Sequence, residues 1–393
     1  MKHSDPRAPI AEDWQKGDFG LYIHWPFCQS KCPYCDFNSH VQQTVDQGTW
    51  LSAYQSEIKR VGLLTQGRSL QSVFFGGGTP SLMQPGLVEG ILKEVSSTWR
   101  LSNACEITLE ANPSSVEAGR FQDYRNAGVN RISMGIQALN DNDLRRLGRL
   151  HTAAEARRAF DIAREIFDRV SFDLIYARQN QTVAQWESEL SLALSMSVDH
   201  LSLYQLTVEN GTVFGDRFAR GMLTGLPDEN RAADLYILTQ DLCSAAGMPA
   251  YEISNHARSG AESRHNMIYW NAGDYAGIGP GAHGRLTHSG QRWATEATKH
   301  PADWLEKVAH GNPDITCNSL STHEQGIEYL LMGLRTTNGI DLKRFSALAG
   351  KDFDKQALEY LTDLKLIIVS NDVLRATEEG RLLLNRVIEK LAC

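Results

Sequence analysis

The chain reads LYIHWPFCQSKCPYC over residues 21–35, so Cys28, Cys32 and Cys35 lie close together just after an apolar run. Three thiolates on one short loop can ligate three irons of a cubane [4Fe-4S] cluster, because such a loop wraps the cluster without a scaffold of its own. The next three residues, DFN, bring no fourth cysteine at a useful spacing. A cluster held here would therefore keep one iron free for another ligand.

A zinc site is the main alternative for these cysteines, with His24 or His40 as the fourth ligand. Zinc-binding cysteines usually come as C-x2-C with a distant second pair. The C-x3-C-x2-C spacing fits that pattern poorly, so we favour iron. The other cysteines are scattered along the chain, and we interpret them as small apolar residues or inert thiols.

Six apolar, strand-like runs alternate with helical patterns between residues 20 and 210, and they are nearly continuous in Val, Ile, Leu, Phe and Tyr, as in strands covered on both faces. Six βα units imply a parallel sheet with right-handed crossovers. We therefore predict a partial (β/α)6 TIM-type barrel, with a doubly wound sheet as the alternative, and functional residues at the carboxyl ends of the strands. The predicted strands are LYIHW (21–25), SVFFG (72–76), EITLEAN (106–112), RISMGIQ (131–137), VSFDLIY (170–176) and HLSLYQLTV (200–208), and the helical patterns between them lie at 50–64, 87–95, 116–127, 153–167 and 183–195.

The rest of the chain changes character twice. A less regular stretch follows the barrel pattern, with a helix expected at 228–246 and a Gly-rich run, GDYAGIGPGAHG, at 273–284, which together predict a small α+β segment. The last part shows helical patterns, a short hairpin at 366–377 and a closing helix, an order that resembles a winged-helix module. The predicted domains are a leader at 1–20, the barrel at 21–210, an intermediate region at 211–319 and a winged-helix-like C-terminal domain at 320–393.

Length and charge narrow the classes of function. A chain of 393 residues suits two or three domains, and 42% hydrophobic with 22% charged residues is typical of a folded protein. The net charge of 39 − 47 = −8 disfavours a general nucleic-acid binder. Residues 320–393 hold ten Lys and Arg against eleven Asp and Glu, so the winged-helix-like part lacks the basic excess of a DNA reader. The first twenty residues contain no apolar signal run, and we expect a cytoplasmic protein.

Tyr22 and Tyr34 complete the pattern Y-I-H-W-P-F-C-x3-C-x-Y-C, which resembles the signature of the radical S-adenosylmethionine (SAM) superfamily. More closely, the chain resembles the group that contains oxygen-independent coproporphyrinogen III oxidases and related heme chaperones, from Tyr22 to the C-terminal helix. The resemblance implies a [4Fe-4S] cluster on the three cysteines, with SAM on the free iron. In such proteins one electron from the cluster cleaves SAM to methionine and a 5′-deoxyadenosyl radical.

Further residues match family positions that contact SAM. The run Gly76-Gly77-Gly78-Thr79-Pro80 follows the second predicted strand, where bare backbone can approach the methionyl amine closely. The other matching residues lie at or beyond the ends of later strands, where the active site of such a barrel lies. The number of SAM molecules, one or two, stays open. The resemblance implies that SAM contacts Tyr22, Tyr34, Gly77, Gly78, Thr79, Glu110, Gln137, Arg149 and Asp173.

One segment departs from the family pattern. After the fifth predicted strand the group usually continues Gly-Leu-Pro, whereas this chain has Ala177-Arg178-Gln179. The shape of this loop is therefore less well specified, and Arg178 would add a positive charge near the cofactor mouth.

Two features favour a heme chaperone over an oxidase. The oxidase pattern carries an additional cysteine two residues after the last cluster ligand, where this chain has Phe37. The oxidase also has a longer segment before its first strand, whereas about twenty residues precede Leu21 here. We therefore expect a member without coproporphyrinogen III oxidase activity, and we keep the oxidase, which decarboxylates two propionate side chains, as the alternative. Whether the protein cleaves SAM productively stays open.

The run His265-Asn-Met-Ile-Tyr269-Trp270 matches the HNxxYW pattern associated with heme binding in the chaperones. Histidine is a natural axial ligand of heme iron, and aromatic rings can stack on the porphyrin. His265 is the predicted ligand, within a heme-binding intermediate region, and His256 and His283 are rivals that lack such aromatic neighbours.

The resemblance also implies partners. Heme, a heme-accepting protein and an electron donor for the cluster are expected, while a homodimer and membrane contact through the acceptor are left open. An RNA-modifying radical enzyme would need a basic surface or an RNA-binding module, and the sequence supplies neither. No nucleic-acid partner is expected.

Overall fold

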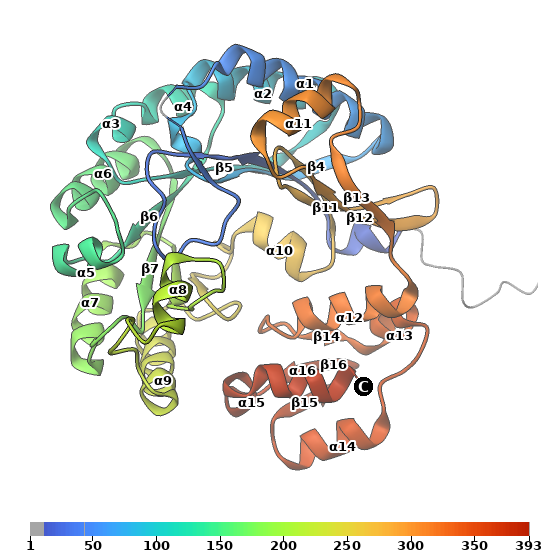
Figure 1. The fold of residues 1–393 in the computed structure, drawn as a ribbon. Helices are drawn as coiled ribbons and strands as arrows, with labels where there is room; N and C mark the ends of the chain where they lie inside the picture. The colour runs from blue at the N-terminus through green and yellow to red at the C-terminus, as the bar shows by residue number, and fades with distance from the viewer. Residues whose placement is uncertain (1–11, 43, 393) are drawn as a thin grey trace, which may run out of the picture.

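The computed structural model describes residues 12–42 and 44–392, and its centre is one curved sheet of 11 strands (Figure 1). The sheet explains the shape of the molecule, because helices cover its convex side and the C-terminal helices lie below its open end. In spatial order the strands are β13 (Asp314–Ser319), β12 (Gln291–Ala297), β11 (His283–His288), β10 (Asp274–Ile278), β1 (Phe19–Trp25), β4 (Ser69–Gly77), β5 (Arg100–Ala111), β6 (Arg131–Gln137), β7 (Arg169–Tyr176), β8 (His200–Gln205) and β9 (Asn255–Ala257).

The six strands β1, β4, β5, β6, β7 and β8 pair in parallel, which confirms the predicted partial (β/α)6 barrel. Their apolar residues are buried on both faces, as the continuous apolar runs predicted. The largest difference is β5, which begins six residues before the predicted 106–112. The polar, exposed stretch at its start pairs with β4 through Ser69 and Arg100, and a polar stretch gives no apolar signal in the sequence.

The helices between these strands agree with the predicted patterns except at 116–127, where the chain forms two short helices separated at Gly119 and Arg120. Reciprocal capping hydrogen bonds, Thr152 with Glu155 and Thr182 with Gln185, fix the first turns of two of the helices. The helices of the barrel are α1 (Gln47–Leu64), α2 (Pro85–Thr98), α3 (Ser115–Ala118), α4 (Phe121–Ala127), α5 (Asp141–Arg146), α6 (Ala153–Ile166) and α7 (Val183–Met196), followed by α8 (Val213–Ala219) and α9 (Glu229–Ala245).

Part of the predicted intermediate region completes the sheet. Strand β10 pairs in parallel with β1, and β11, β12 and β13 continue in antiparallel order. Two more helices belong to this region, α10 (Arg264–Trp270) and α11 (Pro301–Ala309). Close approach of the backbone requires Gly273, because a Cβ there would lie 2.1 Å from the carbonyl oxygen of Gly17. The domain boundaries themselves stay a prediction, and residues 1–11 of the predicted leader lie outside the described residues.

The C-terminal segment forms a three-stranded antiparallel sheet covered by helices, around a core that includes Leu330, Ile340, Leu374 and Val387. Figure 1 shows this segment in red, below α10. Its elements are α12 (Thr322–Gly333), β14 (Ile340–Asp341), α13 (Leu342–Ala349), α14 (Lys355–Asp363), β15 (Ile367–Ser370), β16 (Val373–Ala376), α15 (Glu378–Leu382) and α16 (Leu384–Ala392).

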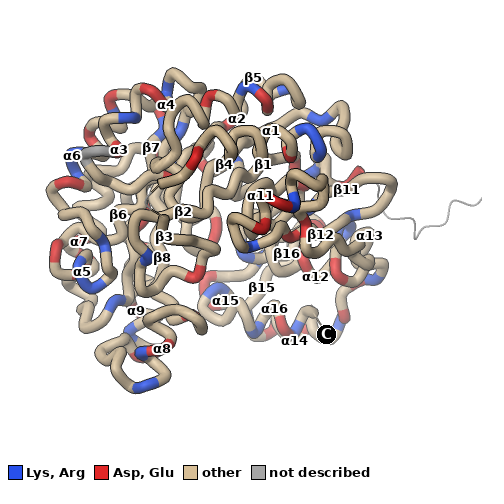
Figure 2. The backbone as a smooth tube through the Cα atoms, turned by 45° about the horizontal axis from the view of Figure 1, so that its top comes forward, with Lys and Arg blue, Asp and Glu red and all other residues tan. Residues whose placement is uncertain are grey.

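Ion pairs connect this C-terminal segment to the rest of the molecule. Asp13 and Arg344 form a buried pair at 2.8 Å, and Arg285 of β11 pairs with Glu328 of α12, also at 2.8 Å. Elsewhere Lys and Arg are interspersed with Asp and Glu along the chain (Figure 2). Within residues 12–42 and 44–392, none of the helices has the length and apolarity required to cross a bilayer.

Candidate functional site

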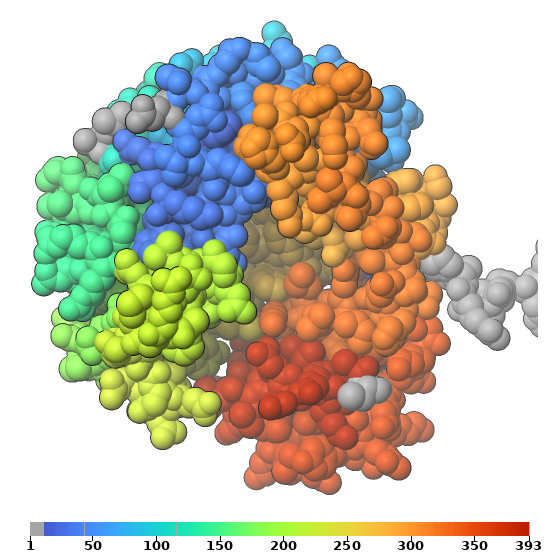
Figure 3. Space-filling model, viewed as in Figure 1, coloured from blue at the N-terminus to red at the C-terminus, as the bar shows by residue number. Residues whose placement is uncertain are grey.

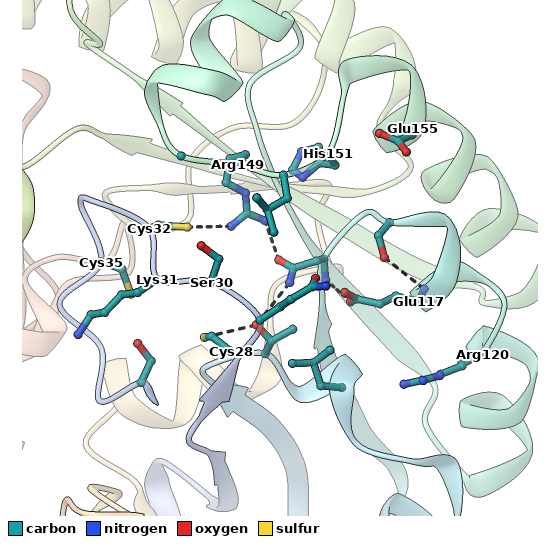
Figure 4. A pocket seen from close by; sticks show the side chains of 18 residues that line it. Cys28, Ser30, Lys31, Cys32, Cys35, Glu117, Arg120, Arg149, His151 and Glu155 are labelled. Atoms are coloured by element: carbon teal, nitrogen blue, oxygen red, sulfur yellow. Dashed lines mark hydrogen bonds between the residues drawn. The ribbon is translucent and has the colours of Figure 1, made fainter. Parts of the chain in front are cut away.

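The three clustered cysteines lie on one loop that leaves the carboxyl end of β1. The loop begins and ends at a short parallel pair, β2 (Phe27–Cys28) with β3 (His40–Val41), and the His40 N–H donates to the carbonyl of Pro26. Cys28, Cys32 and Cys35 all line one cavity (Figure 4), and its volume is about 370 Å³. The structure therefore brings together the three predicted cluster ligands at the edge of the sheet where strand ends meet.

A chain of hydrogen bonds links two of the thiols. Arg149 Nη1 donates to Cys32 Sγ and Thr79 Oγ1 donates to Cys28 Sγ, each at 3.5 Å (Figure 4). Asn112 connects the two donors, because its Oδ1 accepts from Arg149 Nη2 at 2.7 Å and its Nδ2 donates to Thr79 Oγ1 at 3.4 Å. The sequence analysis did not select Asn112, although its place at the end of a predicted strand was a usable signal.

Burial and nearby cations act on the thiols of this cavity, which Lys31, Arg120 and Arg149 line. Burial raises the pKa of the Cys28 and Cys35 thiols. Burial alone would lower the pKa of Arg149, but Tyr34 and Cys32 outweigh it and the pKa is raised, so the guanidinium stays charged. Cysteine binds iron as the thiolate, and Arg149 holds a positive charge 3.5 Å from Cys32 Sγ.

Two carboxyl groups lie deep in the barrel, at the ends of β5 and β7. Burial and repulsion from Asp173 raise the pKa of Glu110 to about 8, although the Gly77 N–H opposes the shift. Burial likewise raises the pKa of Asp173 to about 6, against a hydrogen bond from Ser202. Both side chains keep partial access to solvent. A cationic or hydroxyl-rich ligand in the barrel would relieve this cost by pairing with the ionised carboxylates.

A positive φ marks two predicted SAM contacts, one of them a strained non-glycine residue. Gln137 has φ 72° at the end of β6, and its buried Oε1 has no hydrogen-bond partner among the described residues. Gly77 has φ 111° at the end of β4, and a Cβ there would lie 2.6 Å from the His24 ring. A left-handed non-glycine residue with an unpartnered polar atom is typical of a ligand site, because such strain persists only where the surroundings impose it.

A larger cavity of about 1050 Å³ opens beside the cluster loop, and we call it the mouth cavity. Figure 3 shows a hollow at the centre of the molecule, above the red C-terminal segment. Met332 and Arg335 of that segment line the cavity, together with the exposed Phe37 of the cluster loop. Of the residues predicted from sequence, it is lined by Tyr22, Gly77, Glu110, Tyr269 and Trp270.

His265 is adjacent to this cavity but does not line it. It is 2% exposed, its Nδ1 bonds Ser72 Oγ at 2.7 Å, and its Nε2 bonds the Tyr269 hydroxyl at 2.6 Å. Its ring stacks on Phe74 with centroids 4.8 Å apart. Both ring nitrogens are therefore occupied in this conformation, and ligation of iron by His265, which stays a prediction, requires one of these bonds to break.

The segment that departs from the family pattern keeps a left-handed turn. Ala177, where the family usually has glycine, has φ 59°. The expectation that Arg178 adds charge at the cofactor mouth is wrong, because its guanidinium is buried and pairs with Glu189 and, at 2.9 Å, with Asp143. Burial of a cation requires such partners, and the nearby carboxylates could not be recognised in the sequence.

Comparisons with known proteins agree with the geometry. Residues 22–193 match the model of the radical SAM superfamily, and residues 320–383 match the HemN C-terminal domain. The chain is 36% identical to heme chaperone HemW of Haemophilus influenzae, over 94% of this chain and 96% of that protein, and 35% identical to heme chaperone HemW of Escherichia coli, over 94% and 97%.

The chain belongs to the HemW family of radical SAM proteins. Another relative is the mouse mitochondrial radical S-adenosyl methionine domain-containing protein 1, which is 42% identical over 81% of this chain and 74% of its own length. The fold is similar to that of coproporphyrinogen III oxidase (HemN) from E. coli, with a TM-score of 0.80 over 98% of this chain and 92% of that chain, at 21% identity.

Membership of this family implies a [4Fe-4S] cluster and SAM, and the residues present fit both groups. Three thiols line one cavity, and the buried Oε1 of Gln137 has no hydrogen-bond partner among the described residues. Glu110 and Asp173 add two carboxyl groups whose pKa is raised by burial and whose hydrogen-bond donors are the Gly77 N–H and Ser202. Among the described residues, no three His, Cys, Asp or Glu side chains converge on a single metal ion. Convergence is not required for a cubane, because each thiolate binds a different iron.

Proposed function

We propose that this protein is a heme chaperone, which binds heme and a SAM-ligated [4Fe-4S] cluster and transfers heme to an acceptor protein. The observation that carries the proposal is similarity over nearly the whole chain to two proteins named heme chaperone HemW. The mouth cavity supports it, because its size and its lining of Phe37, Trp270 and other aromatic residues suit a large flat ligand.

The residues divide into three roles. Cys28, Cys32 and Cys35 would hold the cluster, which supplies single electrons to bound SAM. Glu110, Gln137, Arg149 and Asp173, with Tyr22, Tyr34 and the Gly77-Gly78-Thr79 turn, would orient SAM on the free iron. Tyr269 and Trp270 would contact heme, with His265 as the ligand predicted from sequence. Four points stay expectations: the electron donor, the identity of the acceptor, a homodimer and membrane contact through the acceptor.

The second candidate is an oxygen-independent coproporphyrinogen III oxidase. The similarity in fold to HemN favours this candidate, and the mouth cavity is large enough for a tetrapyrrole substrate. Phe37 disfavours it, since the oxidase pattern has a cysteine there. The exposed Phe37 ring offers an apolar contact at the place where the oxidase pattern has a thiol.

One preparation separates the two functions. The protein is purified anaerobically and reconstituted with iron and sulfide, and loading is verified as about four irons per chain. We expect it to bind heme, to transfer heme to apomyoglobin as a generic acceptor, and to leave coproporphyrinogen unchanged in the presence of SAM and dithionite. A Cys32→Ala variant, which loses one cluster ligand, controls for heme bound without the cluster. Sustained decarboxylation of coproporphyrinogen, or no heme binding, would refute the chaperone function.

A further inference from the structure

Heme iron needs an axial imidazole whose nitrogen lone pair is free and faces the space where the macrocycle lies. The mouth cavity is lined by three histidines, His24, His40 and His283. His24 is unsuitable, because its Nδ1 bonds the Tyr22 hydroxyl at 3.0 Å and its Nε2 bonds the carbonyl of Asn38 at 2.9 Å. His40 bonds Asn38 Oδ1 through Nε2 at 3.2 Å.

His283 differs from the other two. Its side chain is 59% exposed, and Nε2 lies 3.9 Å from Glu296 Oε1, beyond hydrogen-bond distance. His283 and Glu296 are direct partners across β11 and β12. A carboxylate behind an imidazole is the usual outer partner of a metal-binding histidine, since it fixes the tautomer and the direction of the ring. Rotation of the ring so that Nδ1 meets Glu296 would make this hydrogen bond and leave Nε2, the nitrogen through which histidine ligates heme iron, for the cavity.

The Gly-rich run at 273–284 places His283 on the cavity rim. Asn38 of the cluster loop donates from Nδ2 to the carbonyls of Pro280 at 2.9 Å and Lys299 at 2.8 Å. This approach needs glycine at position 281, which has φ 74° and where a Cβ would lie 2.6 Å from Asn38 Nδ2. The turn before His283 is therefore fixed against the same loop that presents Phe37 to the cavity.

The rest of the lining suits a flat apolar dianion. Phe37 is 60% exposed, so its ring is available to cover a macrocycle. Trp270 also lines the cavity, and its buried Nε1 has no hydrogen-bond partner within the part of the chain that the structure describes. Lys31 and Arg335 line the cavity as well, and heme carries two propionates that such cations can pair with. Lys299 also lines it, but its Nζ pairs with Glu296 Oε1 at 3.0 Å.

We infer that His283, oriented by Glu296, is the axial ligand of heme in the mouth cavity, with Phe37 against the macrocycle and the rim cations on the propionates. The inference rests on the proposed function and names the residues that bind heme. It assigns His265 a structural role. The hydrogen bond to Ser72 connects α10 to β4, and the hydrogen bond to Tyr269 lies within α10.

The test is an anaerobic heme titration of the full chain, read by the Soret band. His283→Ala should weaken heme affinity by more than the roughly 10–100-fold that loss of an outer partner costs, and Glu296→Gln by about that amount. His283→Cys should give the spectrum of a thiolate-ligated heme, which is a gain of signal rather than a loss. His310→Ala, at an exposed histidine after α11, is the matched control.

His265→Gln completes the set, because glutamine can keep polar contacts with Ser72 and Tyr269 but is a poor iron ligand. We expect it to retain the wild-type Soret band. If His283→Ala binds heme with wild-type affinity and spectrum, the inference is wrong, and loss of the band in His265→Gln would then identify His265 as the ligand. Both results leave the chaperone function intact. A wild-type protein that binds no heme would instead refute the proposed function itself.

Discussion

Replacement of Arg149 by alanine should weaken SAM binding while the cluster still assembles. The side chain is held by Asn112 Oδ1 at 2.7 Å and by the Gly135 carbonyl at 2.8 Å, and its buried Nε has no partner among the described residues. That free N–H is available to a ligand carboxylate. A hydrogen bond to a charged group contributes about 1.5–3 kcal/mol, which corresponds to roughly 10- to 150-fold in affinity.

The measurement is isothermal titration of SAM into the anaerobically reconstituted protein, with iron content determined on the same sample. Arg145→Ala, at an exposed arginine of α5, is the matched control and should bind SAM like wild type. Arg149→Lys should recover part of the affinity, since lysine keeps the charge but loses the planar fork. If Arg149→Ala binds SAM within twofold of wild type at full iron content, the reasoning about the free N–H is wrong.

Three further predictions concern stability. Gly77→Ala should lower the free energy of unfolding by more than about 2 kcal/mol, because φ 111° strains an alanine and its Cβ would meet the His24 ring; thermal unfolding measures this, and a change below about 0.5 kcal/mol would contradict it. Arg344→Ala should cost about 3 kcal/mol, because the buried Asp13 then keeps only the longer contact with Lys16, at 3.6 Å. The double variant with Asp13→Ala should cost less than the sum of the two single changes. In the absence of SAM, Glu110 favours folding when protonated, since its folded pKa of about 8 exceeds the unfolded value of 4.5. Its contribution to the free energy of unfolding is therefore lost as pH rises from 4.5 to 8. The stability difference between wild type and Glu110→Gln should change over that window, and parallel pH profiles would contradict the prediction.

Local sequence patterns predicted most of the barrel. A strand that is buried on both faces is rich in apolar residues, and the run at 131–137, with Ile132, Met134 and Ile136, matches β6 residue for residue. The other five parallel strands differ mainly at their ends. The polar start of β5 could not be predicted from its composition, because its residues join the sheet by pairing with the neighbouring strand β4. Strands β10 to β13 also join the sheet through partners distant in the chain.

The candidate site divides in the same way. The three cysteines could be selected from sequence, since cluster ligation depends on the spacing of residues along one short loop. The hydrogen bonds of Asn112 could not, because their partners are Thr79, which follows β4, and Arg149, which follows α5, both more than thirty positions away in the chain. Arg178 shows the reverse error, in which a charge expected at the cofactor mouth is neutralised by carboxylates from other elements.

The sequence by itself therefore determined what lies within a few residues of a given position: the βα alternation, the thiolate loop, the glycine turn after β4 and the aromatic run at 265–270. Only the tertiary structure decided which polar groups are buried, paired or accessible. His265 has a ligand-like motif, yet Ser72 of β4 occupies one of its nitrogens and Tyr269 of its own helix occupies the other, while the turn after β10 leaves His283 exposed on the cavity rim. The physical reason is that ligation requires a free lone pair in an open space, and both conditions are set by contacts between segments far apart in the chain.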